Sequence, residues 1–108
     1  MPWWKWISRQ HEAAGPEVSR YRPADGVSAA SRDGRTVLLD MGAERYMGLD
    51  EVGSDIWLHL AERRSVPEIA ACLAIEYAAP ADRLETDVRR FMTEMHARGL
   101  VVPAETTH

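Results

Sequence analysis

The sequence predicts an α+β domain in which a run of short strands precedes a run of helices. An Asp-Gly pair at residues 33–34 separates two extended stretches, which is the commonest signal for a two-residue hairpin. From Asp50 to Gly99, apolar residues instead recur at the i, i+3, i+4 and i+7 positions of helices. Strands followed by helices are typical of the α+β class.

Three antiparallel strands are expected, joined as a meander. The first covers residues 26–31, and the second, residues 35–40, is apolar on consecutive positions, as in the middle strand of three. Gly42 lies in the following turn, where it is available for a positive φ. The third strand runs from Arg45 to Leu49. This strand is expected to be an unpaired sheet edge, which the protein offers to another peptide.

Three helices are expected after the sheet. Asp50 is the N-cap of the first, which ends near Glu62. Ser65-Val66-Pro67-Glu68 is a capping box that begins the second, and Ala79-Pro80 ends it. The third helix stops at Gly99, a typical residue after a helix end. Its apolar stripe consists of Leu84, Val88, Phe91, Met92 and Met95.

The composition bounds the size and the class of the protein. Its 108 residues, 45% hydrophobic and 28% charged, suffice for one globular domain. The net charge of −4 argues against a broad basic surface that would bind nucleic acid. One cysteine, Cys72, rules out an intramolecular disulfide. Since no apolar run reaches the ~20 residues of a membrane span and no secretion signal is present, we expect a cytoplasmic protein.

The first 24 residues differ from the rest. They hold three of the four tryptophans, Trp3, Trp4 and Trp6, and the breaker pair Gly15-Pro16. We expect residues 1–24 to be a flexible extension. The alternative is an aromatic, weakly basic foot that touches a membrane surface or a partner enzyme. The domain is assigned to residues 25–102, and residues 103–108 to a tail.

No catalytic or metal-binding constellation is evident. The four histidines are scattered, and none lies at metal-ligand spacing from Cys72. Cys72 itself stands inside a predicted helix, without the motif of a nucleophile. The glycines form no phosphate-binding loop. We therefore expect no enzymatic activity, no metal and no cofactor.

A series of short motifs follows the order and separations of a known family. The series runs Leu-Leu-Asp, Arg-Tyr, Leu-Asp, Val-Gly, Ile-Trp, Ser-Val, Glu-Ile and Gly-Leu-Val between residues 38 and 101. It resembles the PqqD-like family, the leader-peptide recognition elements of ribosomally made, post-translationally modified peptides. The resemblance covers about residues 25–102, and its strength lies in the ordered series, since no single motif is specific.

The resemblance implies a winged-helix-like fold of three antiparallel strands followed by three helices. It also implies that a precursor's leader adds as a strand to the third strand, in a groove whose other wall is the third helix. About half of the apolar stripe on that helix is expected to be core instead. Because main-chain pairing would give the affinity, Met47→Pro is expected to abolish binding. The implied site residues are Arg45, Tyr46, Met47, Gly48, Leu49, Leu84, Asp87, Val88, Phe91, Met92 and Met95.

The resemblance implies a partner enzyme as well. A free-standing chain of this length resembles the recognition protein of lasso-peptide maturation, which delivers the leader to a cysteine-type leader protease. The alternative is the pyrroloquinoline-quinone peptide chaperone, which serves a radical SAM enzyme. Two functions of another class stay open. One is a winged-helix nucleic-acid binder, against which the net charge counts, and the other is a module that dimerises through the same edge.

Overall fold

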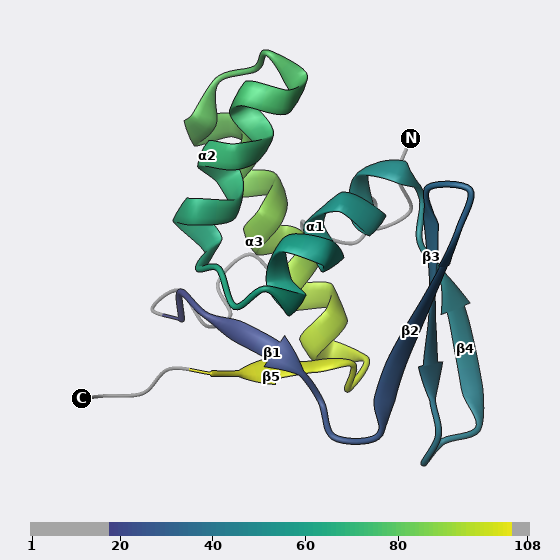
Figure 1. Ribbon diagram of the computed structural model, residues 1–108. Coiled ribbons are helices and arrows are strands. Elements are labelled where there is room, and N and C mark those ends of the chain that lie inside the picture. Colours follow the sequence, from purple (N-terminus) through teal and green to yellow (C-terminus); the bar gives the residue numbers. More distant parts are fainter. Residues whose placement is uncertain (1–17, 105–108) are drawn as a thin grey trace.

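The computed structural model describes residues 18–104, which form two small sheets and three helices (Figure 1). The elements are β1 (Tyr21–Pro23), β2 (Val27–Arg32), β3 (Arg35–Asp40), β4 (Arg45–Gly48), α1 (Glu51–Ala61), α2 (Val66–Tyr77), α3 (Ala81–Ala97) and β5 (Val101–Pro103). β2, β3 and β4 form an antiparallel sheet in that order, and β1 pairs with β5. In Figure 1 the helices lie on one side of the three-stranded sheet, with α1 next to it and α2 farther away, and the face on that side is here called the inner face. The predicted meander and three helices are confirmed.

The two turns of the meander differ in how they reach positive φ. Asp33 and Gly34 have φ values of 55° and 78°, as a type I′ hairpin requires. The second turn lies where it was predicted, at residues 41–44, but its positive φ, 54°, falls on Glu44 and not on Gly42. This turn is closed by Asp40, whose Oδ1 accepts the Ala43 N–H at 3.2 Å.

The helix starts follow the predicted caps. Asp50 Oδ1 accepts the Gly53 N–H at 2.8 Å at the start of α1. At the start of α2, the Ser65 N–H donates to Glu68 Oε1 at 2.7 Å, and the Glu68 N–H donates to Ser65 Oγ at 3.2 Å. Both halves of the capping box are therefore present. After α3, Gly99 has a φ of 77°, as predicted for the residue that follows a helix end.

The core lies between the helices and the inner face of the sheet, and it takes most of the α3 stripe. Val88, Phe91, Met92 and Met95 are all 0% exposed. The expectation that only half of this stripe is core is therefore wrong. One cause is the close approach of α1: a Cβ at Gly53 would lie 3.2 Å from Phe91 Cε1.

β1 corrects the predicted domain boundary. It lies within the 24 residues assigned to a flexible extension, yet Tyr21 is only 8% exposed and pairs with Pro103. The domain therefore begins before residue 25, and its last strand extends into the expected tail. Residues 1–17, which include the three clustered tryptophans, and residues 105–108 lie outside the described residues.

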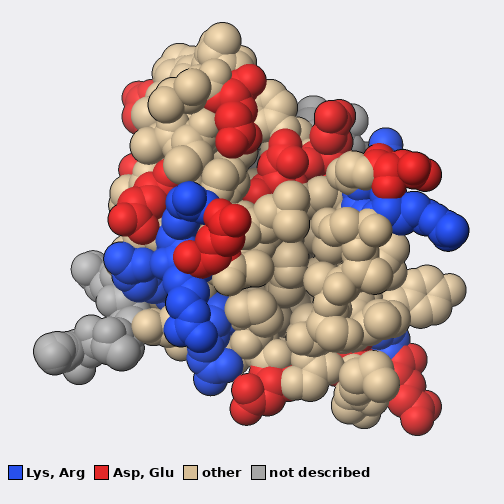
Figure 2. Space-filling model, viewed as in Figure 1, with Lys and Arg blue, Asp and Glu red and all other residues tan. Residues whose placement is uncertain are grey.

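Charges are mixed over the surface shown in Figure 2. Blue and red side chains are interleaved beside the helices, whereas a broad area to the right, over the sheet, is largely uncharged. Within residues 18–104, no helix combines the length and the apolar character needed to cross a membrane.

Candidate functional site

β4 is an edge strand that immediately precedes α1. It pairs with β3 on one side, and no strand of residues 18–104 pairs with its other side. Such an edge presents a row of main-chain N–H and C=O groups to an incoming strand. The predicted sheet edge is thus present, and β2 forms the opposite edge of the same sheet.

The last residue pair of the β3–β4 ladder shows which of its pairs are hydrogen-bonded, here called the phase of the ladder. The Leu49 N–H donates to Thr36 O at 2.8 Å. In an antiparallel ladder, pairs that exchange hydrogen bonds alternate with pairs that do not. By this alternation, the bonded pairs are Thr36 with Leu49, Leu38 with Met47, and Asp40 with Arg45.

This phase determines which groups β4 presents to solvent. The N–H and C=O groups of Arg45 and Met47 face β3, so those of Tyr46 and Gly48 point away from the sheet. Two residues of β4 therefore supply the main-chain groups of the edge. At Gly48, no atom beyond its chain neighbours lies within 4 Å of where a Cβ would stand.

A hydroxyl from α1 anchors the end of the ladder. Ser54 Oγ accepts the Thr36 N–H at 2.8 Å and donates to Leu49 O at 3.5 Å. Ser54 and Thr36 are each 1% exposed. The hydroxyl thus bridges the last pair of strands β3 and β4 inside the core, and it ties the edge strand to the helices.

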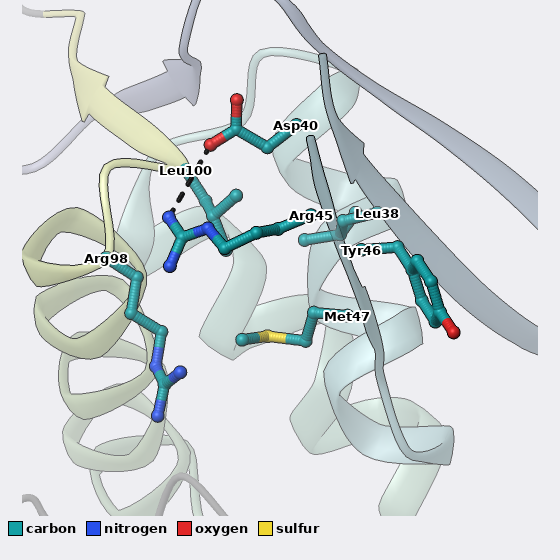
Figure 3. Close-up of a pocket in the computed structure, with 7 residues that line it drawn as sticks. All are labelled: Leu38, Asp40, Arg45, Tyr46, Met47, Arg98 and Leu100. Atoms are coloured by element: carbon teal, nitrogen blue, oxygen red, sulfur yellow. Dashed lines mark ion pairs between the residues drawn. The ribbon is translucent and has the colours of Figure 1, made fainter. Parts of the chain in front are cut away.

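The side chains of β4 alternate between the two faces of the sheet (Figure 3). Arg45 and Met47 point toward α3 on the inner face, while Tyr46 points the opposite way. Tyr46 is 78% exposed, and its cross-strand partner Leu39 is also exposed. Met47 is partly buried against the core.

A pocket of about 150 Å³ lies beside β4, near the C-terminal end of α3 (Figure 3). Leu38 and Leu100 are buried and give it an apolar floor. Arg45 forms an ion pair with Asp40 at 3.7 Å, and Arg98 Nε donates to the carboxylate of Glu94. The lining residues are Leu38, Asp40, Arg45, Tyr46, Met47, Arg98 and Leu100.

The structure brings together only part of the predicted site. Arg45, Tyr46 and Met47 line the pocket, and Gly48 lies on the same edge. Leu49 is 2% exposed and belongs to the core.

The predicted wall on α3 is different from the one observed. Of its six predicted residues, Val88, Phe91, Met92 and Met95 are fully buried, and Leu84 and Asp87 are half-buried and do not line the pocket. On the helix side, the pocket is lined instead by Arg98 and Leu100. Sequence reasoning missed both of these residues, because they follow the apolar stripe and stand where α3 ends.

The potential metal-ligating side chains are scattered over the described part of the chain. Within residues 18–104, no group of three His, Cys, Asp or Glu side chains could hold a metal ion. Cys72 is a half-buried free thiol. On α3, Arg89 pairs with Glu85 at 3.0 Å, and Glu94 pairs with Arg98, the residue that follows the helix.

Two solved structures share this fold. TbiB1 in complex with the TbiA(beta) leader peptide superposes with a TM-score of 0.73 and 32% identity, covering 79% of this chain and 99% of that one. Lasso peptide synthetase B1 complexed with the leader peptide gives a TM-score of 0.72 and 26% identity, covering 79% and 100%. The protein is thus a small α+β domain with the fold of these recognition elements for ribosomally made, modified peptides.

The sequence comparisons are more specific. Residues 35–101, from β3 into β5, match the family described as Coenzyme PQQ synthesis protein D (PqqD). A relative from Rhizobium meliloti (strain 1021), described as PqqA binding protein, is 35% identical over 68 residues, which are 63% of this chain and 67% of the relative. The chain belongs to the PqqD family.

Proposed function

We propose that this protein binds the leader segment of a ribosomally made precursor peptide as an added strand on β4, and that it delivers the leader to a maturation enzyme. The observation that carries the proposal is the edge of β4 that no described strand pairs with, in a fold shared with two solved complexes with leader peptides. The relative from Rhizobium meliloti is itself described as a binding protein, for PqqA.

Strand addition explains affinity and selectivity separately. Leader residues opposite Tyr46 and Gly48 would exchange main-chain hydrogen bonds with β4, whatever their side chains are. Leader residues opposite Arg45 and Met47 would instead direct their side chains toward α3, into the pocket. The edge therefore supplies binding to any extended segment, and the pocket supplies discrimination.

The lasso-peptide pathway is the better supported of the two candidate pathways. One solved relative is a lasso peptide synthetase B1, which favours delivery to a cysteine-type leader protease in the cytoplasm. The alternative is delivery to a radical SAM enzyme, which the resemblance to the pyrroloquinoline-quinone peptide chaperone implies and which the relative named PqqA binding protein keeps open. In either pathway, the protein acts by binding and leaves the chemistry to its partner.

Binding to nucleic acid is less well supported. Two basic side chains, Arg89 on α3 and Arg98 just after it, form ion pairs with carboxylates of that helix. Phosphate contacts would have to compete with these pairs.

The test is a fluorescence-polarisation titration of the full chain with labelled leader peptides, taken from precursor genes that neighbour its own. The expected dissociation constant is roughly 0.1 to 10 μM, equivalent to about −10 to −7 kcal/mol. Gly48→Pro removes a main-chain N–H that points away from the sheet, and it removes no side chain. It should weaken binding at least roughly tenfold, which corresponds to the loss of one good hydrogen bond or more. Gly48→Ala keeps the N–H and places its methyl group in open space, so it is the matched control.

The choice of residue for this test matters. Met47→Pro would remove an N–H that faces β3, so a loss of binding could reflect loss of the sheet. Circular dichroism should show that Gly48→Pro and Gly48→Ala are both folded. Equal affinities of these two variants would contradict pairing along β4, and no binding of any neighbouring leader by the folded protein would overturn the proposed function.

A further inference from the structure

We infer that the pocket beside β4 selects leaders that carry an acidic side chain, glutamate or aspartate, at the residue opposite Arg45. This inference rests on the proposed function and deepens it. Strand addition alone requires an extended segment, whereas the pocket adds a requirement for one chemical group at one position.

The phase of β4 brings that leader residue close to Arg45. The main-chain groups of Arg45 face β3, so an incoming residue opposite Arg45 forms a pair without hydrogen bonds. In such pairs the Cα atoms are only about 4.5 Å apart, and the side chains point to the same face. The incoming side chain therefore points to the inner face of the sheet, into the space between Arg45 and α3 (Figure 3).

The charges that line the pocket favour a carboxylate there. Two of the three charged lining residues, Arg45 and Arg98, are cationic, and the third is Asp40. The side chains of Arg45 and Arg98 are 62% and 41% exposed, so both guanidinium groups are accessible from solvent. The Asp40 side chain is only 17% exposed and is held by Arg45 and by the Ala43 N–H.

The existing ion pair of Arg45 leaves room for another acceptor. Arg45 approaches Asp40 through Nη2, and Arg98 adds its positive charge at the rim while it donates through Nε to Glu94. The Arg45 guanidinium has five N–H donors in a planar fork, so it can bind a second carboxylate without losing the first.

The size and floor of the pocket fit one acidic side chain. The volume of about 150 Å³ is enough for a single side chain of moderate length. Leu38, Leu100 and Met47 provide apolar surface for its methylene stem, while the carboxylate reaches the guanidinium groups at the rim. A lysine or arginine at this leader position would meet two like charges and one carboxylate, that of Asp40, which is already paired with Arg45. The site therefore disfavours a cationic side chain.

The test uses the leader that binds most tightly in the titration above, with each Glu and Asp replaced singly by Gln and Asn. Replacement of the acidic residue opposite Arg45 should weaken binding about fivefold, and replacement of any other acidic residue should not. Arg45→Gln combined with Arg98→Gln should weaken the unchanged leader by a similar factor. The double variant should no longer distinguish the acidic leader from its neutral form, which shows that the two changes remove one interaction.

Arg83→Gln is the matched control, since it changes the same charge at an exposed position on α3 that does not line the pocket. It should leave the affinity and the preference for the acidic leader unchanged. If the leader binds but no acidic position matters, or if leucine there binds as well as glutamate, the acidic subsite is wrong and the proposed function stands. If no leader binds, the proposed function fails, and this inference fails with it.

Discussion

At the scale of single residues, one hydroxyl connects the helices to the edge strand. Ser54, in the first turn of α1, accepts the N–H of Thr36 and reaches the carbonyl of Leu49. Without it, a buried N–H at the end of the β3–β4 ladder would have no partner in this arrangement. An unsatisfied buried donor costs more than the hydrogen bond itself contributes, because its desolvation is not compensated.

Ser54→Ala should therefore lower the free energy of unfolding by about 2 kcal/mol. Urea denaturation followed by tryptophan fluorescence measures this, since Trp57 is buried in α1. Ser28→Ala, an exposed change on β2, is the control and should stay within about 0.5 kcal/mol of the parent. Equal stability of Ser54→Ala and Ser28→Ala would show that Ser54 is not needed there.

Residue-level sequence reasoning worked where the signal was local. The Asp33-Gly34 turn was predictable because both positions need positive φ, and the structure has both. The second turn was also placed correctly, but its positive φ at Glu44 was not predicted, because a glycine that is free to adopt positive φ does not have to do so. Arg98 was missed because it lines the pocket together with residues of β4, and the two segments come together only in the folded structure.

At the scale of elements, the start of α2 shows how a helix end becomes sensitive to acid. The pKa of Glu68 is lowered by the hydrogen bond from the Ser65 N–H, by the Ser65 hydroxyl, and by Arg20 and Arg64 nearby. A lowered pKa means that the folded state favours the ionised carboxylate. Its contribution to stability is present above the ordinary value of 4.5 and is lost as the pH falls through the lowered pKa.

Glu68→Gln should flatten this part of the pH dependence. The difference in melting temperature between parent and variant should be largest near neutral pH and should shrink as the pH falls below 4.5. Thermal unfolding across a pH series measures it. Glu44→Gln in the exposed second turn is a suitable control, and a difference that grows in acid would contradict the assignment.

The helices were predictable because each segment contains its own capping residues and its own apolar stripe. Asp50 and Ser65 cap α1 and α2 as expected. The stripe of α3 also predicted a buried face, yet only about half of it was expected to be core, whereas Val88 and Met92 and most of the stripe are fully buried. A stripe shows that a face is apolar, and only the packing of the other elements shows whether that face stays open.

At the scale of the whole molecule, β1 and β5 close the domain by joining its two described ends. Their pairing links residues about 80 positions apart, Tyr21 with Pro103 and Pro23 with Val101. Short strands paired over such a separation leave no periodic pattern in either segment. This is why sequence reasoning placed the boundary of the domain after β1.

Tyr21→Ala should test how much this closure stabilises the domain. Tyr21 joins the main core and is 8% exposed, so its truncation should cost about 3 kcal/mol. Urea denaturation of the full chain measures the loss. Arg22→Ala, at the exposed neighbour, is the control. A loss below about 1 kcal/mol would mean that residues 18–24 belong to an extension after all.

The alternating orientation of main-chain groups along β4 also has an evolutionary consequence. Under strand addition, a precursor gene could drift freely at every codon whose residue pairs only through its peptide group, provided that no proline arises. Selection would act on the few codons whose side chains enter the pocket. Paralogous pathways in one genome could then separate by exchanging a handful of complementary charges, with the scaffold of both domains left unchanged.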